Sequence, residues 1–276
     1  MKVGFIGAGN MGGLLLMSLL EAGAFAASDA IVSTRTPPRA QRLAERFPGL
    51  TVARHNAQTA RESDIVFLCV RPSDFREVAG EIAPVLGPDQ IVVSIASPIS
   101  IGLMEREFPS KIAKIIPSVV NAGRRGVTLL MFGSRLTEED RARLTGLCAA
   151  VSRPVEIDER HVRAASDLSS CSPAFFAFLL ERMIDAAVAE ADLDRDLAER
   201  IVLETLSGTA ALLESGLFSL RELRERVSVP GGITAAALEE LHRGLGDTFG
   251  RVLRTTHRKF AEDVEKVERA FSLPPR

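Results

Sequence analysis

The stretch Lys2-Val-Gly-Phe-Ile-Gly-Ala-Gly-Asn-Met-Gly12 decides the fold of this chain. It predicts a short apolar strand, Val3–Ile6, that runs into the pattern Gly7-x-Gly9-x-x-Gly12 and then into an apolar helix over Met11–Leu20. The first glycine allows a tight turn, the second lets the backbone approach a pyrophosphate, and the third lets helix and strand pack closely. The helix N-terminus adds free N–H groups and a positive dipole end. This order predicts a Rossmann dinucleotide-binding turn.

The same stretch loosely imitates a secretory signal, because Lys2 precedes an apolar run to Leu20 and then Ala24-Phe-Ala26. Asn10 and the cluster of glycines interrupt that apolar run. A dinucleotide-binding turn explains these residues and a secretory signal does not. We therefore expect a cytoplasmic protein whose N-terminal stretch is part of the folded domain.

The composition argues against several classes of protein. Of the 276 residues, 46% are apolar, which is enough for a substantial core, and the net charge of −2 lacks the basic footprint of a nucleic-acid-binding protein. No run of about 18 apolar residues predicts a membrane span. Three cysteines, Cys69, Cys148 and Cys171, stand far apart in the sequence. Their odd number and spacing favour buried thiols in a reducing cytoplasm over a disulfide framework or a metal site.

The first half of the chain alternates strands with helical segments. Thr36 is expected to cap a helix that begins at Pro37 and ends near Arg46. Alternation of this kind predicts an α/β fold with a mainly parallel sheet and helices on both faces. After Val3–Ile6, strands are predicted at Ala30–Ser33, Thr51–Ala53, Asp64–Val70, Gln90–Ile95, Lys111–Ile116, Gly126–Phe132 and Pro154–Ile157.

Beyond about Asp158 the strand patterns stop and only helices are predicted. We expect a Rossmann NADP-binding domain over residues 1–157 and an all-helical substrate and dimerisation domain over 158–276. A ligand is expected in a cleft between two such domains, and the excess of apolar residues in the second domain favours a homodimer. The predicted helices are Pro173–Ala191, Asp194–Glu214, Leu220–Val227, Ala235–Arg243 and Asp247–Ala270.

The end of the second strand indicates which cofactor is bound. NAD enzymes usually carry Asp or Glu there, about 20 residues after the glycine turn, for the ribose 2′-hydroxyl. This chain has Ser33-Thr34-Arg35-Thr36 and no carboxylate. A guanidinium with neighbouring hydroxyls suits a 2′-phosphate. Arg35 therefore predicts NADP, although a solvated surface arginine is the alternative.

With these residues in place, the chain resembles pyrroline-5-carboxylate reductase, the enzyme that makes proline, over nearly its full length. The resemblance is carried by Phe5–Gly12, by Asn56 and by Cys69-Val-Arg-Pro72, where the family has Ala-Val-Lys-Pro. Val93–Ser100 matches a strand and loop of the family except at Ser97-Pro98. The resemblance and the glycine turn together imply these cofactor-binding residues: Gly7, Ala8, Gly9, Asn10, Met11, Gly12, Ser33, Thr34, Arg35, Asn56, Cys69, Val70, Arg71 and Pro72.

Two further motifs carry the resemblance in the second half. The family's Gly-Ser-Gly-Pro-Ala-Tyr helix start corresponds to Ser170–Phe175, and its Ser-Pro-Gly-Gly-x-Thr turn corresponds to Val229–Thr234. A Gly-Gly pair ahead of a helix makes an anion-binding backbone turn, which suits a substrate carboxylate. By resemblance, Thr234 is the catalytic candidate, and the substrate-binding candidates are Ser118, Cys171, Ser172, Gly231 and Gly232.

Departures from the family pattern gather around the substrate. The family's Met-Pro-Asn-Thr-Pro is Ile116-Pro-Ser-Val-Val120 here, and its pocket serine is Cys171. Together with Ser94–Ser100 and Ser166–Phe176, these changes resemble a narrower, late-competence (ComER-like) branch of the family. Members of that branch share the fold without an assumed role in making proline.

The remaining ionisable residues exclude one alternative and favour imine chemistry. No lysine occurs between Ile115 and Arg258, so the predicted helix Pro173–Ala191 lacks the general acid–base lysine of β-hydroxyacid-type dehydrogenases. The four histidines, of which His55 is the first, show no catalytic or metal pairing. A cyclic iminium accepts hydride without a strong enzymic acid, so the site mainly has to hold and align its substrate.

Three functions are thus open from the sequence. The first is an NADPH-dependent reductase acting on the C=N bond of a cyclic imino acid. The second is a catalytically weak or inactive NADP-binding regulatory protein of the competence-associated branch, which Ser118, Val119 and Cys171 favour. The third is a reductase for a related imine or ketone.

Overall fold

The computed structural model describes residues 1–272, and its sheet unit is built on eight strands in the order β3-β2-β1-β4-β5-β6-β7-β8. All neighbouring strands pair in parallel except β6 and β7, which are antiparallel. Every predicted strand is present, several of them shorter than expected. The strands are β1 Val3–Ile6, β2 Ala30–Ser33, β3 Thr51–Val52, β4 Ile65–Leu68, β5 Ile91–Ser94, β6 Lys111–Ile116, β7 Val127–Phe132 and β8 Arg153–Glu156.

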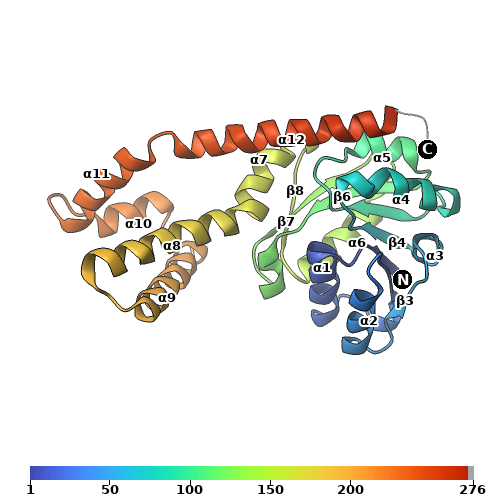
Figure 1. Ribbon diagram of the computed structural model, residues 1–276, viewed down its shortest axis with the longest axis horizontal. Coiled ribbons are helices and arrows are strands. Elements are labelled where there is room, and N and C mark those ends of the chain that lie inside the picture. The colour runs from blue at the N-terminus through green and yellow to red at the C-terminus, as the bar shows by residue number, and fades with distance from the viewer. Residues whose placement is uncertain (273–276) are drawn as a thin grey trace. The chain divides into compact units, whose positions relative to one another are not determined.

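Helices cover both faces of this sheet (Figure 1). Phe5 and Phe67 stack within the apolar layer that also holds residues of α1, α2 and α6. The alternate strand residues, such as Ile6 and Leu68, join α4, α5 and the C-terminal part of α12 (Thr248–Ser272) on the other face. Such alternation is expected of strands buried on both faces. The helices here are α1 Asn10–Glu21, α2 Pro37–Arg46, α3 Asn56–Arg61, α4 Phe75–Ile82, α5 Ile101–Glu107, α6 Glu138–Ala149 and α7 Val162–Ser166.

The strand order reverses at β1. From β1 the chain first builds outward to β2 and β3, and then crosses to β4 on the opposite side. The carboxyl ends of β1, β2 and β4 therefore meet at Gly7, Ser33 and Cys69. In open α/β sheets this switch point is where ligands bind.

After a π-helical turn at Asp167–Cys171, the described part of the chain contains five helices joined by short turns and loops, and no strand. All five predicted helices are present, and Leu220–Val227 has the expected bounds. They are α8 Ser172–Ala191, α9 Arg195–Glu214, α10 Leu220–Val227, α11 Ile233–Leu245 and α12 Thr248–Ser272. None of the helices within residues 1–272 is long and apolar enough to cross a membrane.

The chain forms two compact units, one of residues 1–173 with 255–276 and one of residues 174–254. These units do not coincide with the predicted ranges 1–157 and 158–276, because both ends of the helical half pack on the sheet unit. Val267 and Phe271 lie against α4 and α5, and Thr256 Oγ1 donates a 2.6 Å hydrogen bond to Asp167. A helical pattern alone does not say which unit a helix packs against.

One predicted cap is wrong in its contacts. Thr36 does precede α2, and Pro37 is the first helical residue. The side chain of Thr36 makes no capping hydrogen bond, and the backbone N–H of Thr36 instead donates to Thr34 Oγ1 at 3.3 Å. A cap side chain bonds the N–H of the second or third helical residue; here the second, Pro38, has none, and the third, Arg39, donates its N–H to the carbonyl oxygen of Thr36 at 3.0 Å.

Candidate functional site

In the glycine turn, each of the three glycines occupies a position where its lack of a side chain matters. Gly7 has a φ of +102° and donates its N–H to Ser33 O at 2.8 Å. A Cβ atom on Gly9 would have no neighbour within 4 Å, so the space over this residue is open. A Cβ atom on Gly12 would lie 2.5 Å from the Cβ of Cys69. The turn therefore ties β1 to β2 and β4 and leaves room for a ligand at its centre.

Helix α1 begins at this turn without a side-chain cap. Gly9 is the N-cap residue, and no side chain accepts a hydrogen bond from the first turn. The first N–H groups of a helix need an acceptor, and its N-terminus favours negative charge. An open, uncapped helix start over a glycine fits a pyrophosphate.

A cavity of about 440 Å³ opens at this edge of the sheet. Ten predicted cofactor residues line it: Gly7, Ala8, Gly9, Ser33, Thr34, Arg35, Asn56, Cys69, Val70 and Arg71. Asn10 lines a neighbouring groove between α1 and α2. Met11 and Gly12, in the first turn of α1, and Pro72, in the segment after β4, line neither space.

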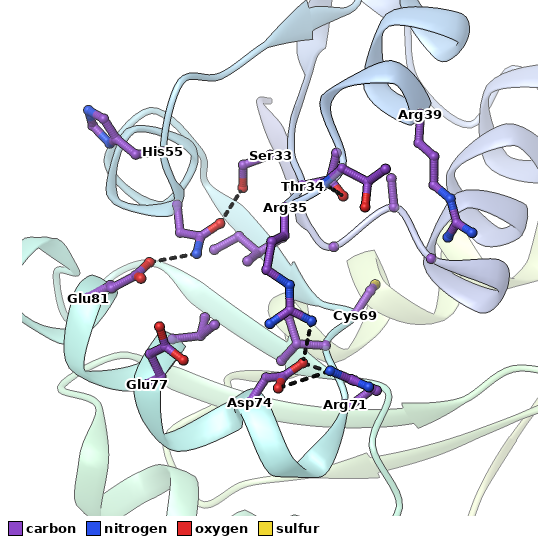
Figure 2. Close-up of a pocket in the computed structure, with 18 of the residues that line it drawn as sticks. Ser33, Thr34, Arg35, Arg39, His55, Cys69, Arg71, Asp74, Glu77 and Glu81 are labelled. Carbon is purple, nitrogen blue, oxygen red and sulfur yellow. Dashed lines mark hydrogen bonds and ion pairs between the residues drawn. The ribbon is translucent and has the colours of Figure 1, made fainter. Parts of the chain in front are cut away.

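A hydrogen-bonded chain of side chains crosses one side of the cavity. Ser33 Oγ donates to Asn56 Oδ1 at 2.8 Å, and Asn56 Nδ2 donates to Glu81 Oε2 at 2.6 Å. Ser33 is buried at the end of β2, where Figure 2 shows its side chain, and Asn56 is the first residue of α3. The three side chains come from β2, α3 and α4, so the two hydrogen bonds hold Asn56 between a strand and a neighbouring helix.

Two guanidinium groups converge on one carboxylate at the other side. Arg35 Nη2 lies 3.2 Å from Asp74 Oδ2, and Arg71 Nε lies 3.1 Å from the same oxygen. Figure 2 shows both arginines directed at Asp74. The hydrogen bond from Arg71, together with the nearby charge of Arg35, holds the pKa of Asp74 below its usual range, so this carboxylate is ionised at neutral pH.

Besides Thr36, sequence reasoning missed six charged or polar residues that line the same cavity. Arg39 follows Arg35 by four residues, and the pattern Arg35-Thr-Pro-Pro-Arg39 at a helix start was a usable indication of it. His55 accepts a hydrogen bond from Gln58 N at 3.1 Å and so caps α3. The acidic residues come from the segment after β4, which no local pattern links to the glycine turn. The six are Arg39, Arg54, His55, Asp74, Glu77 and Glu81.

The three cysteines are free thiols. Burial raises the pKa of Cys148 to about 12 and also raises the pKa of Cys69, which lies against the glycine turn. Both thiols therefore stay protonated at neutral pH. No group of three or more His, Cys, Asp or Glu side chains within residues 1–272 is arranged to hold a metal ion.

Three predicted substrate residues gather around the π-helical turn. Ser118 is fully buried and its Oγ donates to Ser169 O at 3.3 Å. Ser172 Oγ donates to Asp167 O at 2.7 Å. Arg163 Nη2 lies 3.1 Å from Cys171 Sγ and 2.8 Å from Asp167 Oδ1. The hydroxyl protons of both serines are thus used within the sheet unit.

The other predicted substrate residues form a turn in the helical unit. Gly231 has a φ of +75°, a conformation that favours glycine, and Gly232 is the N-cap of α11. No side chain caps this helix, and Thr234 lies in its first turn. The N–H groups at this helix start have the same character as those at α1 and suit an anion.

Two family models match the chain. Residues 2–98 match a model described as NADP oxidoreductase, coenzyme F420-dependent, and residues 159–263 match one described as pyrroline-5-carboxylate reductase dimerisation. The first match confirms the prediction of NADP as the cofactor.

Similar proteins span most or nearly all of the chain. The ComE operon protein 4 of Bacillus subtilis is 36% identical, over 99% of this chain and 100% of its own. Pyrroline-5-carboxylate reductase of Mycobacterium tuberculosis is 30% identical, over 88% of this chain and 90% of its own. The crystal structure of Plasmodium falciparum pyrroline carboxylate reductase with NADP bound shares the fold, at 23% identity and a TM-score of 0.82 over 97% of each chain. This chain therefore belongs to the pyrroline-5-carboxylate reductase family.

Proposed function

We propose that this protein is an NADPH-dependent reductase that transfers hydride to the C=N carbon of a cyclic imino acid, giving proline or a close relative. The observation that carries the proposal is the pair of uncapped helix starts, each preceded by a glycine turn. The turn at α1 opens into the cavity of the nucleotide domain, and the turn Gly231-Gly232 opens α11. One suits a pyrophosphate and the other a carboxylate.

In this proposal the sheet unit holds the cofactor through backbone N–H groups of the glycine turn and through the side chain of Arg35. The N–H groups at the start of α1 bind the pyrophosphate, and Arg35 with Ser33 and Thr34 binds the 2′-phosphate. Asn56 and the loop Cys69–Arg71 line the remaining wall. When bound, NADPH supplies the hydride.

The helical unit supplies the substrate contacts in the same proposal. The N–H groups around Gly231 and Gly232 hold the carboxylate, and the hydroxyl of Thr234 forms a hydrogen bond with the imine nitrogen. An iminium accepts hydride at carbon without a strong acid, so holding and alignment supply most of the rate enhancement. In the sheet unit, Ser118, Cys171 and Ser172 remain the proposed substrate residues, and we assign no proton transfer to the two serines because their hydroxyl protons are already donated.

We further propose a homodimer formed through the C-terminal helices. Large apolar side chains are exposed along α8 and α9, among them Phe178, Met183 and Ile201, which are 58%, 64% and 50% exposed. Contiguous exposed apolar surface marks an interaction site.

The free state of all three cysteines favours the reducing cytoplasm as the place of action.

A second function is favoured by a different observation. Val119 and Val120 are 51% and 37% exposed where the family carries Thr-Pro, and Cys171 replaces the family's pocket serine. Together with the similarity to the ComE operon protein 4, these changes support an NADP-binding protein with weak or no reductase activity and a competence-associated role.

One assay separates the two. Purified protein is mixed with NADPH and pyrroline-5-carboxylate, and the loss of cofactor absorbance is followed. Sustained turnover supports the reductase. Tight NADPH binding without turnover supports the regulatory protein, and turnover only with another imine or a ketone supports a reductase of different substrate range.

A further inference from the structure

The carboxylate of Asp74 lies beside Arg35, although the sequence around Arg35 contains no acidic residue. The end of β2 carries Ser33-Thr34-Arg35 in place of the acidic residue typical of NAD sites. Asp74, which is 39 positions beyond Arg35, brings an acidic group from the segment after β4 to the guanidinium of Arg35. It bonds Arg35 directly, at 3.2 Å.

Asp74 does not act as a helix cap. It is the N-cap residue of α4, a position at which Asp usually accepts a hydrogen bond from the helix's own first turn. No such bond is present. Both carboxylate oxygens face arginines instead, since Arg71 Nη2 lies 3.4 Å from Oδ1 while Arg71 Nε and Arg35 lie near Oδ2. The side chain is only 20% exposed, whereas both arginines are more than 70% exposed.

We propose that Asp74 is a specificity-determining residue that lowers the preference of this protein for NADP over NAD. Its charge neutralises part of the guanidinium charge that a 2′-phosphate requires, and it repels the phosphate itself. An unphosphorylated ribose presents a hydroxyl at the same place, and a carboxylate accepts a hydrogen bond from a hydroxyl. Asp74 therefore weakens the binding of NADP, and it does not weaken the binding of NAD.

The opposite role, in which Asp74 holds the arginines ready for the phosphate, is the weaker one. Ion pairs between exposed side chains contribute little, because water and salt screen them and both side chains lose freedom. The repulsion between a phosphate dianion and an ionised carboxylate is larger than the contribution of such an ion pair, because the phosphate carries up to twice the charge of a guanidinium. The pKa of Asp74 is lowered in the free protein, so the carboxylate does not escape the repulsion by protonation at neutral pH.

The test uses nucleotide fragments and rests on NADP binding, not on imine reduction. The affinities of the full-length protein and of Asp74→Asn are measured by titration calorimetry with adenosine 2′,5′-bisphosphate and with adenosine 5′-monophosphate. We expect the variant to bind the bisphosphate about tenfold more tightly, a change of ~1.4 kcal/mol, and the monophosphate within about twofold. Unchanged or weaker binding of the bisphosphate would overturn the proposal.

Two further variants keep the result interpretable. Glu77→Gln removes an equal charge from the lining of the same cavity, and we expect a change of about twofold or less, because the arginines pair with Asp74. An equal gain in both variants would show a general charge effect and overturn the assignment to Asp74. Asp74→Glu keeps the charge and should bind the bisphosphate like the unaltered protein. Tighter binding by that variant would contradict the electrostatic origin.

Discussion

Lys114 Nζ donates a 2.8 Å hydrogen bond to Glu159 Oε1 at a place where the lysine side chain is only 1% exposed. Glu159 also accepts a hydrogen bond from the N–H of Ile101, at the start of α5. The pair therefore joins β6, α5 and the segment after β8. Burial lowers the pKa of Lys114, and the neighbouring Glu159 charge partly offsets that effect.

This asymmetry in burial predicts unequal effects of the two single substitutions. Glu159→Gln leaves an ammonium buried without a counter-charge and should lower the free energy of unfolding by about 3 kcal/mol. Lys114→Met removes the buried charge and leaves Glu159, 32% exposed, to water and Ile101. Lys114→Met should lower the free energy of unfolding by less than half as much as Glu159→Gln. Urea unfolding measures both, and an equal or reversed order would contradict the account.

The close approach of Gly12 to Cys69 gives a second prediction. A Cβ atom at position 12 would meet the Cβ of Cys69 at 2.5 Å and also the backbone of Gly7. Gly12→Ala should therefore cost ~1–3 kcal/mol of stability and weaken NADPH binding, because the turn shifts. Thermal unfolding and a fluorescence titration with NADPH measure the two effects.

Gly13→Ala is the matched control, since its new Cβ would have only ordinary contacts, the nearest at 3.5 Å from Ala8 O. Alanine is a better helix former than glycine by about 1 kcal/mol, so this variant should be as stable as the natural protein or more so. Loss of stability at position 13 and none at position 12 would refute the packing argument.

A third prediction concerns acid. Burial raises the pKa of Asp140, but the hydrogen bonds from Lys111 and Thr137 outweigh this, and its pKa lies below the usual range. The stability that these contacts contribute is fully present above the unfolded-state pKa, near 3.9, and is lost as the pH falls through the lower native-state value.

Asp140→Asn removes the ion pair with Lys111 and should lower the free energy of unfolding by about 1 kcal/mol at pH 7. The difference between variant and natural protein should shrink as the pH falls below about 4. Denaturant unfolding across that range checks it, with Glu138→Gln, whose side chain is 94% exposed, as control. A difference independent of pH would show that Asp140 does not act through its charge.

The order of elements and the nucleotide turn were predictable because both depend on local sequence. Ala30–Ser33 and Lys111–Ile116 are short stretches rich in apolar residues, and each forms a strand with the expected bounds. Gly7, Gly9 and Gly12 carry a spacing that few other structures require. These features need no knowledge of what lies far away in the chain.

What the sequence did not predict depends on contacts between distant residues. Asp74 reaches Arg35 across 39 positions, and Lys114 reaches Glu159 across 45. The return of Val267 to the sheet unit is of the same kind. Local periodicity predicts that a side chain is buried or exposed, but it does not say which partner satisfies a charge.

The proposed homodimer gives a fourth prediction. Met183→Glu and Ile201→Glu each place a charge within an exposed apolar face of the helical unit, and either should shift a dimer toward monomer by about tenfold or more in Kd. Gln41→Glu, on the exposed side of α2, should not. Analytical ultracentrifugation measures the equilibrium. A monomeric natural protein, or variants that dimerise unchanged, would contradict the proposal.

Thr234 gives the fifth prediction. If its hydroxyl bonds the imine nitrogen, Thr234→Ala should lower kcat by ~10-fold or more while the Kd for NADPH stays within about twofold, and Thr234→Ser should keep most of the activity. A fall in NADPH affinity with kcat unchanged would place Thr234 outside the substrate site.

Isotope transfer tests the central claim most directly. NADPH deuterated at the transferable position of its nicotinamide is incubated with the protein and pyrroline-5-carboxylate, and the product is analysed by mass spectrometry. The account predicts proline that carries one deuterium at the carbon of the former C=N bond. Bound but unconsumed NADPH, with no deuterated product under conditions in which the protein is folded and saturated, would contradict it.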